Sequence, residues 1–271
     1  MSQRTMEAHY RPNWELTQAM GLFGYNCGYA PKDRTETFDE HQRSLVWQLI
    51  GDTAINESSN VLDVGSGIGG PAGWIFQKYK PARLVGIEYL GSSAQAAEAR
   101  YSGQASRPFF LQGDAHNLPV ADGSIDVIFN LESALHYPDK NKFIAECFRV
   151  LKPGGTLCCG DITTNRKLLF APVELLNKLP SQFNSNVHLW SVTDYKNAFR
   201  KHGFELLRHE DASLPIAKSI DDGLQEIKQR GWRASKGFRG RIGFMGVLAG
   251  LLKWRLLGYD LFRVRRPRTA G

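Results

Sequence analysis

The chain has 271 residues, 42% of them hydrophobic, and a formal net charge of +7. This is enough for one α/β domain with a sizeable core and added segments. No stretch approaches the roughly 20 apolar residues that span a bilayer, and the polar start Met1-Ser2-Gln3-Arg4 lacks the apolar core of a signal peptide. We therefore expect a cytoplasmic protein without a membrane-spanning helix.

The positive charge is concentrated in the C-terminal part of the chain. Residues 228–271 contain 12 Lys and Arg against the single acid Asp260, whereas residues 1–227 carry a small negative net charge. Such a basic block suits an anionic lipid, a phosphorylated substrate or nucleic acid, and it is equally typical of a solvated surface.

The four cysteines, Cys27, Cys147, Cys158 and Cys159, do not have the spacing of metal ligands. Cys158 and Cys159 are adjacent, so in a strand they would point to opposite faces. We expect all four to be reduced, and three of them to be small buried apolar residues.

Predicted strands and helices alternate along most of the chain. Residues 1–58 are expected to form an N-terminal helical extension or cap, with turns near 23–31 and a helix from about Phe38 to Ile55. Strand-like runs follow near 60–64, 82–88, 107–112, 125–130 and 155–160, separated by helix-like segments near 70–79, 92–101 and 140–150. This alternation predicts a Rossmann-like, doubly wound α/β sheet in residues 59–271.

The C-terminal third contains one more predicted helix and two strands. Ser191 and Asp194 have the spacing of a capping box, for a helix that ends near Lys201 and is followed by Gly203 as a C-terminal cap. The strands are expected at Phe204–His209 and Tyr259–Val264.

Two connections, at about 165–190 and 212–256, are longer than is usual in a compact domain. Loops of that length are usually functional. Both would leave the sheet at its ligand-binding edge, so we expect them to form lids.

An acidic, glycine-rich loop follows the first predicted strand, with the sequence Asp63-Val64-Gly65-Ser66-Gly67-Ile68-Gly69-Gly70. Glycines let the backbone approach a ligand closely, and the next helix presents free N–H groups. The glycine spacing also fits a dinucleotide site. A carboxylate at Asp63 would repel a pyrophosphate and attract an ammonium group, which favours S-adenosylmethionine over NAD.

Acidic residues also close the next two strands. Glu88, followed by Tyr89, is suited to accept hydrogen bonds from two ribose hydroxyls, and Asp114 from an adenine amino group. Ala115 and His116 follow Asp114, and we expect His116 to border the adenine pocket.

These landmarks, with Asp126-Val127-Ile128-Phe129 and Leu151-Lys152-Pro153-Gly154-Gly155 after them, resemble those of class I S-adenosylmethionine-dependent methyltransferases from about Phe38 to His209. The resemblance implies a seven-stranded sheet whose last strand is antiparallel and inserted beside the sixth. It also implies S-adenosylmethionine as the cofactor. The expected cofactor-binding residues are Tyr29, Asp63, Gly65, Ser66, Gly67, Gly69, Glu88, Tyr89, Asp114, Ala115, His116, Asn130 and Glu132.

His136 is the best candidate for a catalytic base, because it lies just past the fourth strand and has an unperturbed pKa of about 6.5. Asp161 ends the neighbouring strand and is suited to orient the imidazole. The structural alternatives are a histidine that closes a helix start and an aspartate in a turn. His188, in the first long connection, is a further candidate for contact with the acceptor.

The chain further resembles small-molecule O-methyltransferases of the indolocarbazole-sugar, demethylrifamycin and phthiotriolone type, through Glu132-Ser133, His136, Pro138-Asp139 and Asp161. The resemblance implies that His136 and Asp161 form the base pair. Gly28-Tyr29 resembles a Gly-Tyr that closes over the cofactor, although Tyr25 lies in a second Gly-Tyr. Leu135 stands where some relatives have a second histidine.

Residues 242–255 form an apolar stretch with basic residues at both ends. Lys236, Arg239 and Arg241 precede it, and Arg255 is its last residue. Such a segment can rest on an anionic membrane, cover a hydrophobic substrate, or simply pack on the core. Segment 236–255 is therefore a candidate for peripheral membrane contact.

Together these features predict methylation of a small, largely hydrophobic natural product or lipid, most simply at a hydroxyl. The alternative is carbon methylation of a prenyl diphosphate, sterol or other terpenoid alkene, with basic residues such as Arg230, Arg233, Lys236 and Arg239 holding an anionic group. A nucleic-acid methyltransferase is disfavoured, because the chain lacks an Asn-Pro-Pro-Tyr-type motif and a suitable Pro-Cys site. A non-catalytic scaffold is disfavoured by the intact set of acidic residues. The sequence leaves the oligomeric state open.

Overall fold

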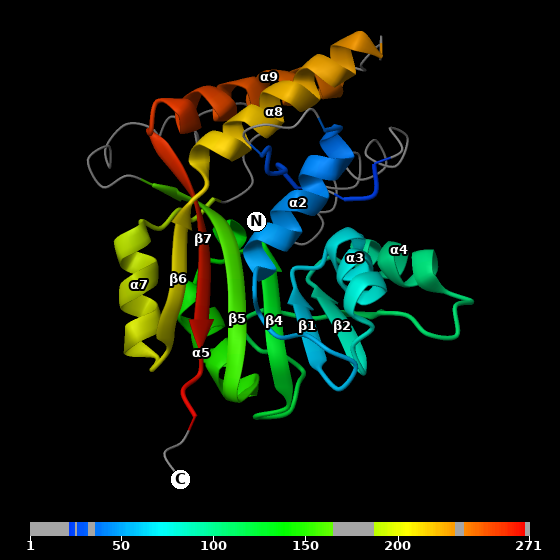
Figure 1. Cartoon of the computed structure of the whole chain (residues 1–271), viewed down its shortest axis with the longest axis vertical. Helices are drawn as coiled ribbons and strands as arrows, with labels where there is room; N and C mark the ends of the chain where they lie inside the picture. The colour runs from blue at the N-terminus through cyan, green and yellow to red at the C-terminus, as the bar shows by residue number, and fades with distance from the viewer. Residues whose placement is uncertain (1–21, 25, 32–35, 165–186, 231–235, 269–271) are drawn as a thin grey trace.

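A seven-stranded sheet forms the centre of the molecule (Figure 1). The structure, a computed structural model, describes residues 22–24, 26–31, 36–164, 187–230 and 236–268, without the side chains of 236–241. The strands lie in the order β3-β2-β1-β4-β5-β7-β6. Their bounds are β1 (Asn60–Val64), β2 (Arg83–Glu88), β3 (Phe109–Gln112), β4 (Ile125–Leu131), β5 (Leu151–Thr164), β6 (Glu205–Asp211) and β7 (Leu257–Arg265).

The last strand is inserted into the sheet with reversed direction. β7 pairs antiparallel with β5 and with β6, whereas the pairs from β3 to β5 are parallel. The Rossmann-like doubly wound sheet and its antiparallel seventh strand are therefore confirmed.

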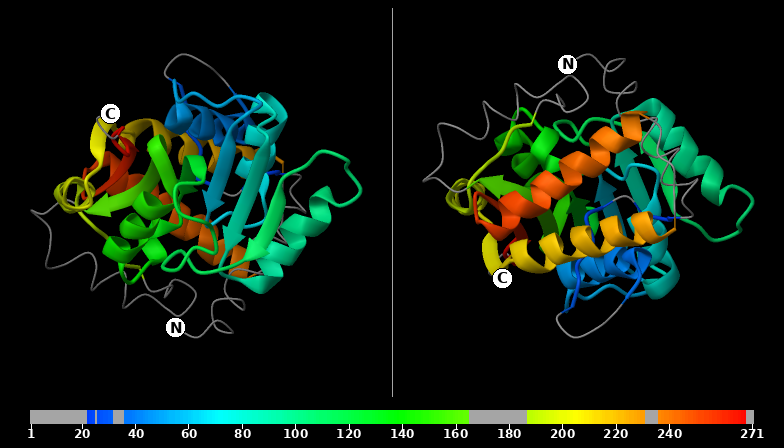
Figure 2. Two further views of the ribbon diagram at one scale, coloured as in Figure 1. Left: turned by 90° about the horizontal axis from the view of Figure 1, so that it is seen from below. Right: turned by 90° about the horizontal axis from the view of Figure 1, so that it is seen from above.

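Helices cover both faces of the sheet (Figure 2). Their bounds are α2 (Phe38–Ile50), α3 (Gly70–Tyr79), α4 (Gly91–Tyr101), the 3-10 helix η1 (Ala134–His136), α5 (Lys140–Val150), α7 (Val192–Lys201), α8 (Ser213–Gln229) and α9 (Lys236–Lys253). One hydrophobic core lies under α2, α3, α4 and α8, and a second lies under α5 and α7. Cys158 belongs to the first core and Cys159 to the second, because successive strand residues face opposite sides. All four cysteines are free and buried.

Helix α2 and strand β5 differ most from their expected boundaries. Helix α2 ends at Ile50 rather than near Ile55, because Gly51 adopts a φ of 55° and its N–H closes the last turn onto Trp47. Strand β5 begins at Leu151, four residues earlier than expected, since the Lys-Pro-Gly-Gly segment already continues the sheet. The capping box of Ser191 and Asp194 on α7 is confirmed.

Helices α8 and α9 pack against each other beyond the carboxyl ends of the parallel strands (Figure 1). They form the connection from β6 to β7, so the segment 212–256 lies at the edge of the sheet where ligands bind. None of the helices in the described ranges is long and apolar enough to cross a membrane. The side chains of Lys236, Arg239 and Arg241 lie outside the described part of the chain, as does most of the expected lid 165–190.

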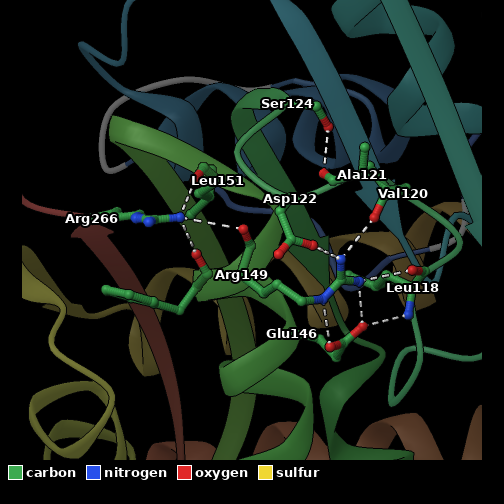
Figure 3. Close-up of polar contacts among 10 residues, drawn as sticks. Leu118, Val120, Ala121, Asp122, Ser124, Glu146, Arg149, Leu151 and Arg266 are labelled. Atoms are coloured by element: carbon green, nitrogen blue, oxygen red, sulfur yellow. Dashed lines mark hydrogen bonds and ion pairs between the residues drawn. The ribbon is translucent and has the colours of Figure 1, made fainter.

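Arg149, near the end of α5, fixes the loop between β3 and β4 (Figure 3). Its guanidinium donates to the carbonyls of Leu118 and Val120 at 2.9 Å each, and it forms ion pairs with Glu146 at 2.7 Å and Asp122 at 2.6 Å. The start of the same loop carries Asp114 to His116. Arg149 therefore anchors the far end of a segment that reaches the predicted cofactor site.

We expect Arg149→Met to lower the free energy of unfolding by about 2–3 kcal/mol, because it leaves carboxylate and carbonyl groups without their donor. Urea unfolding measures the loss, and the exposed Arg200→Met serves as the control. Equal stability of the two variants would contradict the anchoring role.

Candidate active site

A cavity of about 490 Å³ opens at the carboxyl ends of β1, β2 and β4. It brings together residues from the glycine-rich loop, the ends of β2 and β4, the start of the β3–β4 loop, and η1. The predicted site residues on its wall are Asp63, Gly65, Ser66, Gly67, Glu88, Tyr89, Asp114, Ala115, His116, Glu132 and His136.

Asp63 provides an unsatisfied acidic group on this wall. It is 2% exposed, and no partner for its Oδ2 lies among the described residues. Burial raises the pKa of this carboxyl to about 8, and the nearby charge of Glu88 adds to the effect. A buried acid without a partner is costly, so the site suits a ligand that brings a cation to Asp63.

Gly65 and Gly67 both have positive φ values, 77° and 54°, but they face different surroundings. A Cβ on Gly65 would lie 2.2 Å from Ser133 Oγ, whereas a Cβ on Gly67 would meet nothing within 4 Å. Gly65 is therefore required by packing, and Gly67 leaves open space on the cavity wall that a ligand can fill.

We expect Gly65→Ala and Gly67→Ala to separate packing from ligand binding. Gly65→Ala should cost several kcal/mol of stability through its clash with Ser133, beyond the about 1–2 kcal/mol for a left-handed alanine. Gly67→Ala should lower the stability only by the amount expected for a left-handed alanine. It should nevertheless weaken S-adenosylhomocysteine binding at least tenfold. Thermal unfolding and calorimetric titration measure the two effects, and equal unfolding of both variants would refute the assignment.

Glu88 shapes the glycine-rich loop from the end of β2. Its two carboxylate oxygens accept hydrogen bonds from the N–H groups of Gly67 and Leu90, both at 2.9 Å. Burial raises the pKa of Glu88, and these N–H donors act in the opposite direction. The carboxylate thus connects β2 to the loop while it lines the cavity.

Asp114 and His116 form a pair at another part of the wall. Asp114 Oδ1 accepts from the His116 N–H at 2.9 Å and lies 2.7 Å from His116 Nδ1. Partial burial acts to raise the pKa of Asp114, but the hydrogen bonds from His116 prevail and leave it lowered. The Asp114 carboxylate is therefore ionised and held in place.

Glu132 closes the cavity between β4 and the N-terminal segment. Its backbone has a φ of 51°, which is strained for a residue other than glycine. Its Oε1 accepts hydrogen bonds from the Cys27 N–H at 2.9 Å and the Tyr259 hydroxyl at 2.7 Å. Burial is the main cause that raises its pKa. Glu132 thereby joins the N-terminal segment, β4 and β7.

Gly69 and Asn130 lie behind the cavity wall rather than on it. The Gly69 carbonyl accepts from the Tyr101 hydroxyl at 2.8 Å, and Asn130 Nδ2 donates to the Val64 carbonyl at 2.8 Å. Both residues hold the glycine-rich loop in shape, and direct contact with the cofactor stays a prediction for them.

Tyr29 does not line the cavity either. Its hydroxyl donates to Glu210 of β6 at 3.3 Å, and its backbone N–H donates to the His41 carbonyl. Tyr25 lies outside the described residues. Closure of a Gly-Tyr over the cofactor therefore stays a prediction.

His136 belongs to η1 and lines the cavity. It is distant in sequence from the glycine-rich loop, which lines the same cavity. His188 lines the same cavity, and its N–H donates to the Leu135 carbonyl at 2.7 Å. Besides His116, the wall thus carries the imidazoles of His136 and His188. The sequence placed His188 in a long connection, and only tertiary structure brings it to this position.

Asp161 is fully buried and does not line the cavity. Its carboxylate accepts hydrogen bonds from the Tyr195 hydroxyl and, at 3.0 Å, from the Ile162 N–H, and it lies 3.9 Å from Lys140 Nζ. Burial raises its pKa to about 6, and the Lys140 charge opposes that shift. Its predicted action on His136 stays a prediction.

The sequence reading did not assign Ser93 or Tyr137, which line the cavity. Tyr137 lies within the motif that carries His136, and its hydroxyl is 2.8 Å from Ser133 Oγ. That motif was a usable signal. Ser93 belongs to α4, and the sequence pattern of that helix contains no signal that Ser93 lines a cavity.

Comparisons with known proteins identify the family of the chain. Residues 62–159 match the family described as "Methyltransferase domain". Erythromycin 3''-O-methyltransferase of Saccharopolyspora erythraea is 37% identical over 51% of this chain, although the match spans 45% of that protein. Sterol 24-C-methyltransferase of Aspergillus fumigatus is 31% identical over 63% of the chain, again across 45% of its own length.

A solved mycolic acid cyclopropane synthase, in complex with S-adenosylhomocysteine, superposes with a TM-score of 0.82 over 98% of both chains. Its identity of 16% shows the fold alone. Methyltransferase GfsG of Streptomyces halstedii is 30% identical over 78% of this chain and 76% of that protein. With this match, its glycine-rich loop and Asp63 on the cavity wall, the chain belongs to the S-adenosylmethionine-dependent methyltransferases.

Proposed function

We propose that this methyltransferase acts on a hydroxyl of a small, largely hydrophobic natural product or lipid. The observation that carries the proposal is the position of His136 on the wall of the cavity that also contains Asp63 and the glycine-rich loop. S-adenosylmethionine supplies a methyl group on a positively charged sulfur. A hydroxyl acceptor needs a base, and a neutral imidazole suits that role.

Each residue then has a defined task. Asp63 pairs with the ammonium group of the cofactor, and Gly67 allows close approach of the backbone. His136 takes the proton of the acceptor hydroxyl while the oxygen gains the methyl group, and the electron pair of the broken C–S bond stays on the sulfur, which leaves as a neutral thioether. Alignment of the oxygen and exclusion of water supply much of the rate enhancement in such a displacement.

The wall of the cavity supports a hydrophobic acceptor. Leu131 and Pro138 are apolar residues on the wall that also contains His136. Segment 236–255 would then deliver the acceptor from a membrane surface or cover it, which is the basis for proposing peripheral membrane contact. A relative named as an erythromycin O-methyltransferase fits an acceptor of this kind.

Carbon methylation is the second candidate. Glu132 places a buried carboxylate on the cavity wall, next to the hydroxyl of Tyr259. A carboxylate and aromatic rings can stabilise the carbocation that forms when an alkene is methylated. The sterol 24-C-methyltransferase relative fits this chemistry.

Product analysis separates the two candidates. Purified protein is incubated with methyl-labelled S-adenosylmethionine and a panel of hydrophobic alcohols, hydroxylated macrolides, sterols and geranyl diphosphate. We expect the label on oxygen, identified by mass spectrometry and NMR of the product. Label on carbon would overturn the hydroxyl assignment, and loss of turnover in the His136→Gln variant is the control for the site.

A further inference from the structure

Lys140, the first residue of α5, is a lysine without contact to solvent. It is 1% exposed, although lysine is almost never fully buried unless it is paired. Its Nζ donates hydrogen bonds to the carbonyls of Ala134 and His188, both at 2.5 Å. The carboxylate of Asp161 lies 3.9 Å away. A buried ammonium with this set of partners is held in a fixed place.

The two carbonyls belong to the two segments that bring imidazoles to the cavity. Ala134 begins η1, which carries His136, and the second carbonyl is that of His188 itself. These segments are also joined directly, because the His188 N–H donates to the Leu135 carbonyl at 2.7 Å. A single ammonium group therefore connects both parts of the wall.

Neither Lys140 nor Asp161 lines the cavity, so neither is placed to touch a ligand. The buried charge of Lys140 is compensated by Asp161, whose carboxylate also accepts from the Tyr195 hydroxyl. Removal of one member of a buried ion pair is strongly destabilising, whereas replacement of both by neutral groups is often tolerated. This difference lets the role of the charge be separated from the role of the two hydrogen bonds.

We propose that Lys140 is a positioning residue that fixes His136 and His188 on one wall of the active site, so that the acceptor meets two imidazoles. The roles that this inference gives to the two imidazoles rest on the proposed function. His136 remains the base, and His188 becomes a hydrogen-bonding group for the acceptor. Burial and the charge of Lys140 lower the pKa of His188, which favours its neutral, accepting form.

Three variants test the proposal. Lys140→Met removes the ammonium and keeps an apolar chain of similar length. The double variant Lys140→Met/Asp161→Asn also removes the carboxylate, so that no unpaired charge is left in the core. Lys142→Met changes an exposed lysine two residues further along α5 and serves as the matched control.

The readout is amide hydrogen exchange of His136, Tyr137 and His188, whose N–H groups are bonded to Ser133, Ala134 and Leu135. Exchange is compared with that of the β1 amides in the same protein. The imidazole carbon signals of His136 and His188, assigned with the His136→Gln and His188→Gln variants, report the environment of the rings.

We expect at least tenfold faster exchange at these three amides in the double variant, with β1 protected as in wild type, and shifted imidazole signals. Lys142→Met should match wild type. Wild-type protection in the double variant would overturn the proposal, because Lys140 would then only neutralise Asp161. Equally accelerated exchange in β1 would overturn it as well, since the role would be global stability.

Calorimetric titration with S-adenosylhomocysteine accompanies the exchange experiment. We expect the double variant to bind within about threefold of wild type, because Asp63 and Glu88 are held by β1 and β2 rather than by the segments that Lys140 joins. Failure of the wild-type protein to bind would count against the proposed function, while the exchange data would still decide the role of Lys140.

Discussion

The Asp63→Asn variant is expected to bind S-adenosylhomocysteine about 10²- to 10³-fold more weakly than the wild-type protein. The amide keeps the shape of the side chain but cannot pair with an ammonium group, and loss of one partner of a buried charge pair costs about 3–5 kcal/mol. Calorimetric titration measures the change. Asp221→Asn, a substitution on helix α8, is the control. Unchanged affinity of Asp63→Asn would remove the amino-group assignment.

Asp63 also predicts a proton linkage. Because its pKa is raised to about 8, the carboxyl is mostly protonated in the unliganded protein at pH 7 and must ionise to pair with the ligand. Binding should therefore release close to one proton, and affinity should increase with pH between about 6 and 7.5. The dependence of the binding enthalpy on buffer ionisation measures this release, and Asp63→Asn should abolish it.

Whereas the affinity for the ligand increases with pH, the stability of the unliganded protein should decrease as the pH rises. A carboxyl with a raised folded-state pKa contributes stability at low pH and loses it as pH rises through that pKa. The contribution of Asp63 is thus lost between about pH 4 and 8, toward its folded pKa of about 8. We expect Asp63→Asn to unfold at a higher temperature than wild type at pH 8, and a lower temperature would contradict the burial of an unpaired acid.

His136→Gln is expected to reduce turnover by about 10²- to 10⁴-fold, the range typical of a lost general base. The affinity for S-adenosylhomocysteine should stay within about threefold, because the cofactor groups lie on other elements. Turnover is measured on the acceptor found in the product screen, with His202→Gln, at the residue that follows α7, as the control. Normal turnover with normal cofactor affinity would show that another group, such as His188, removes the proton.

Much of the cofactor side of the site could be predicted from the sequence, because its signals are local. The glycine-rich loop follows an apolar strand directly, and Glu88 and Asp114 each stand at the end of a strand. In a parallel sheet these ends meet at one edge, so a pattern of a few residues is enough to place them. The structure brings Asp63, Glu88 and Asp114 to one cavity, as expected.

The acceptor side depends on contacts between distant residues, and there the sequence was less informative. Lys140 and His188 are 48 positions apart and meet through a main-chain carbonyl, which leaves no pattern in the side chains. Asp161 was expected to end its strand, but β5 continues to Thr164, and the Asp161 carboxylate faces Tyr195 of α7, because α7 packs over that face of the sheet. Helix α2 ends earlier than expected because of Gly51, a local signal that is visible in the sequence.

The antiparallel insertion of β7 has a consequence for how the protein folds during synthesis. Strands β5 and β6 do not pair with each other in the finished sheet, because β7 separates them. When residues 205–211 leave the ribosome, their neighbour in the sheet, residues 257–265, has not yet been made. Until it arrives, β5 presents an open edge, and open edges invite pairing with other chains. Nascent chains halted before residue 257 should therefore depend most strongly on chaperones.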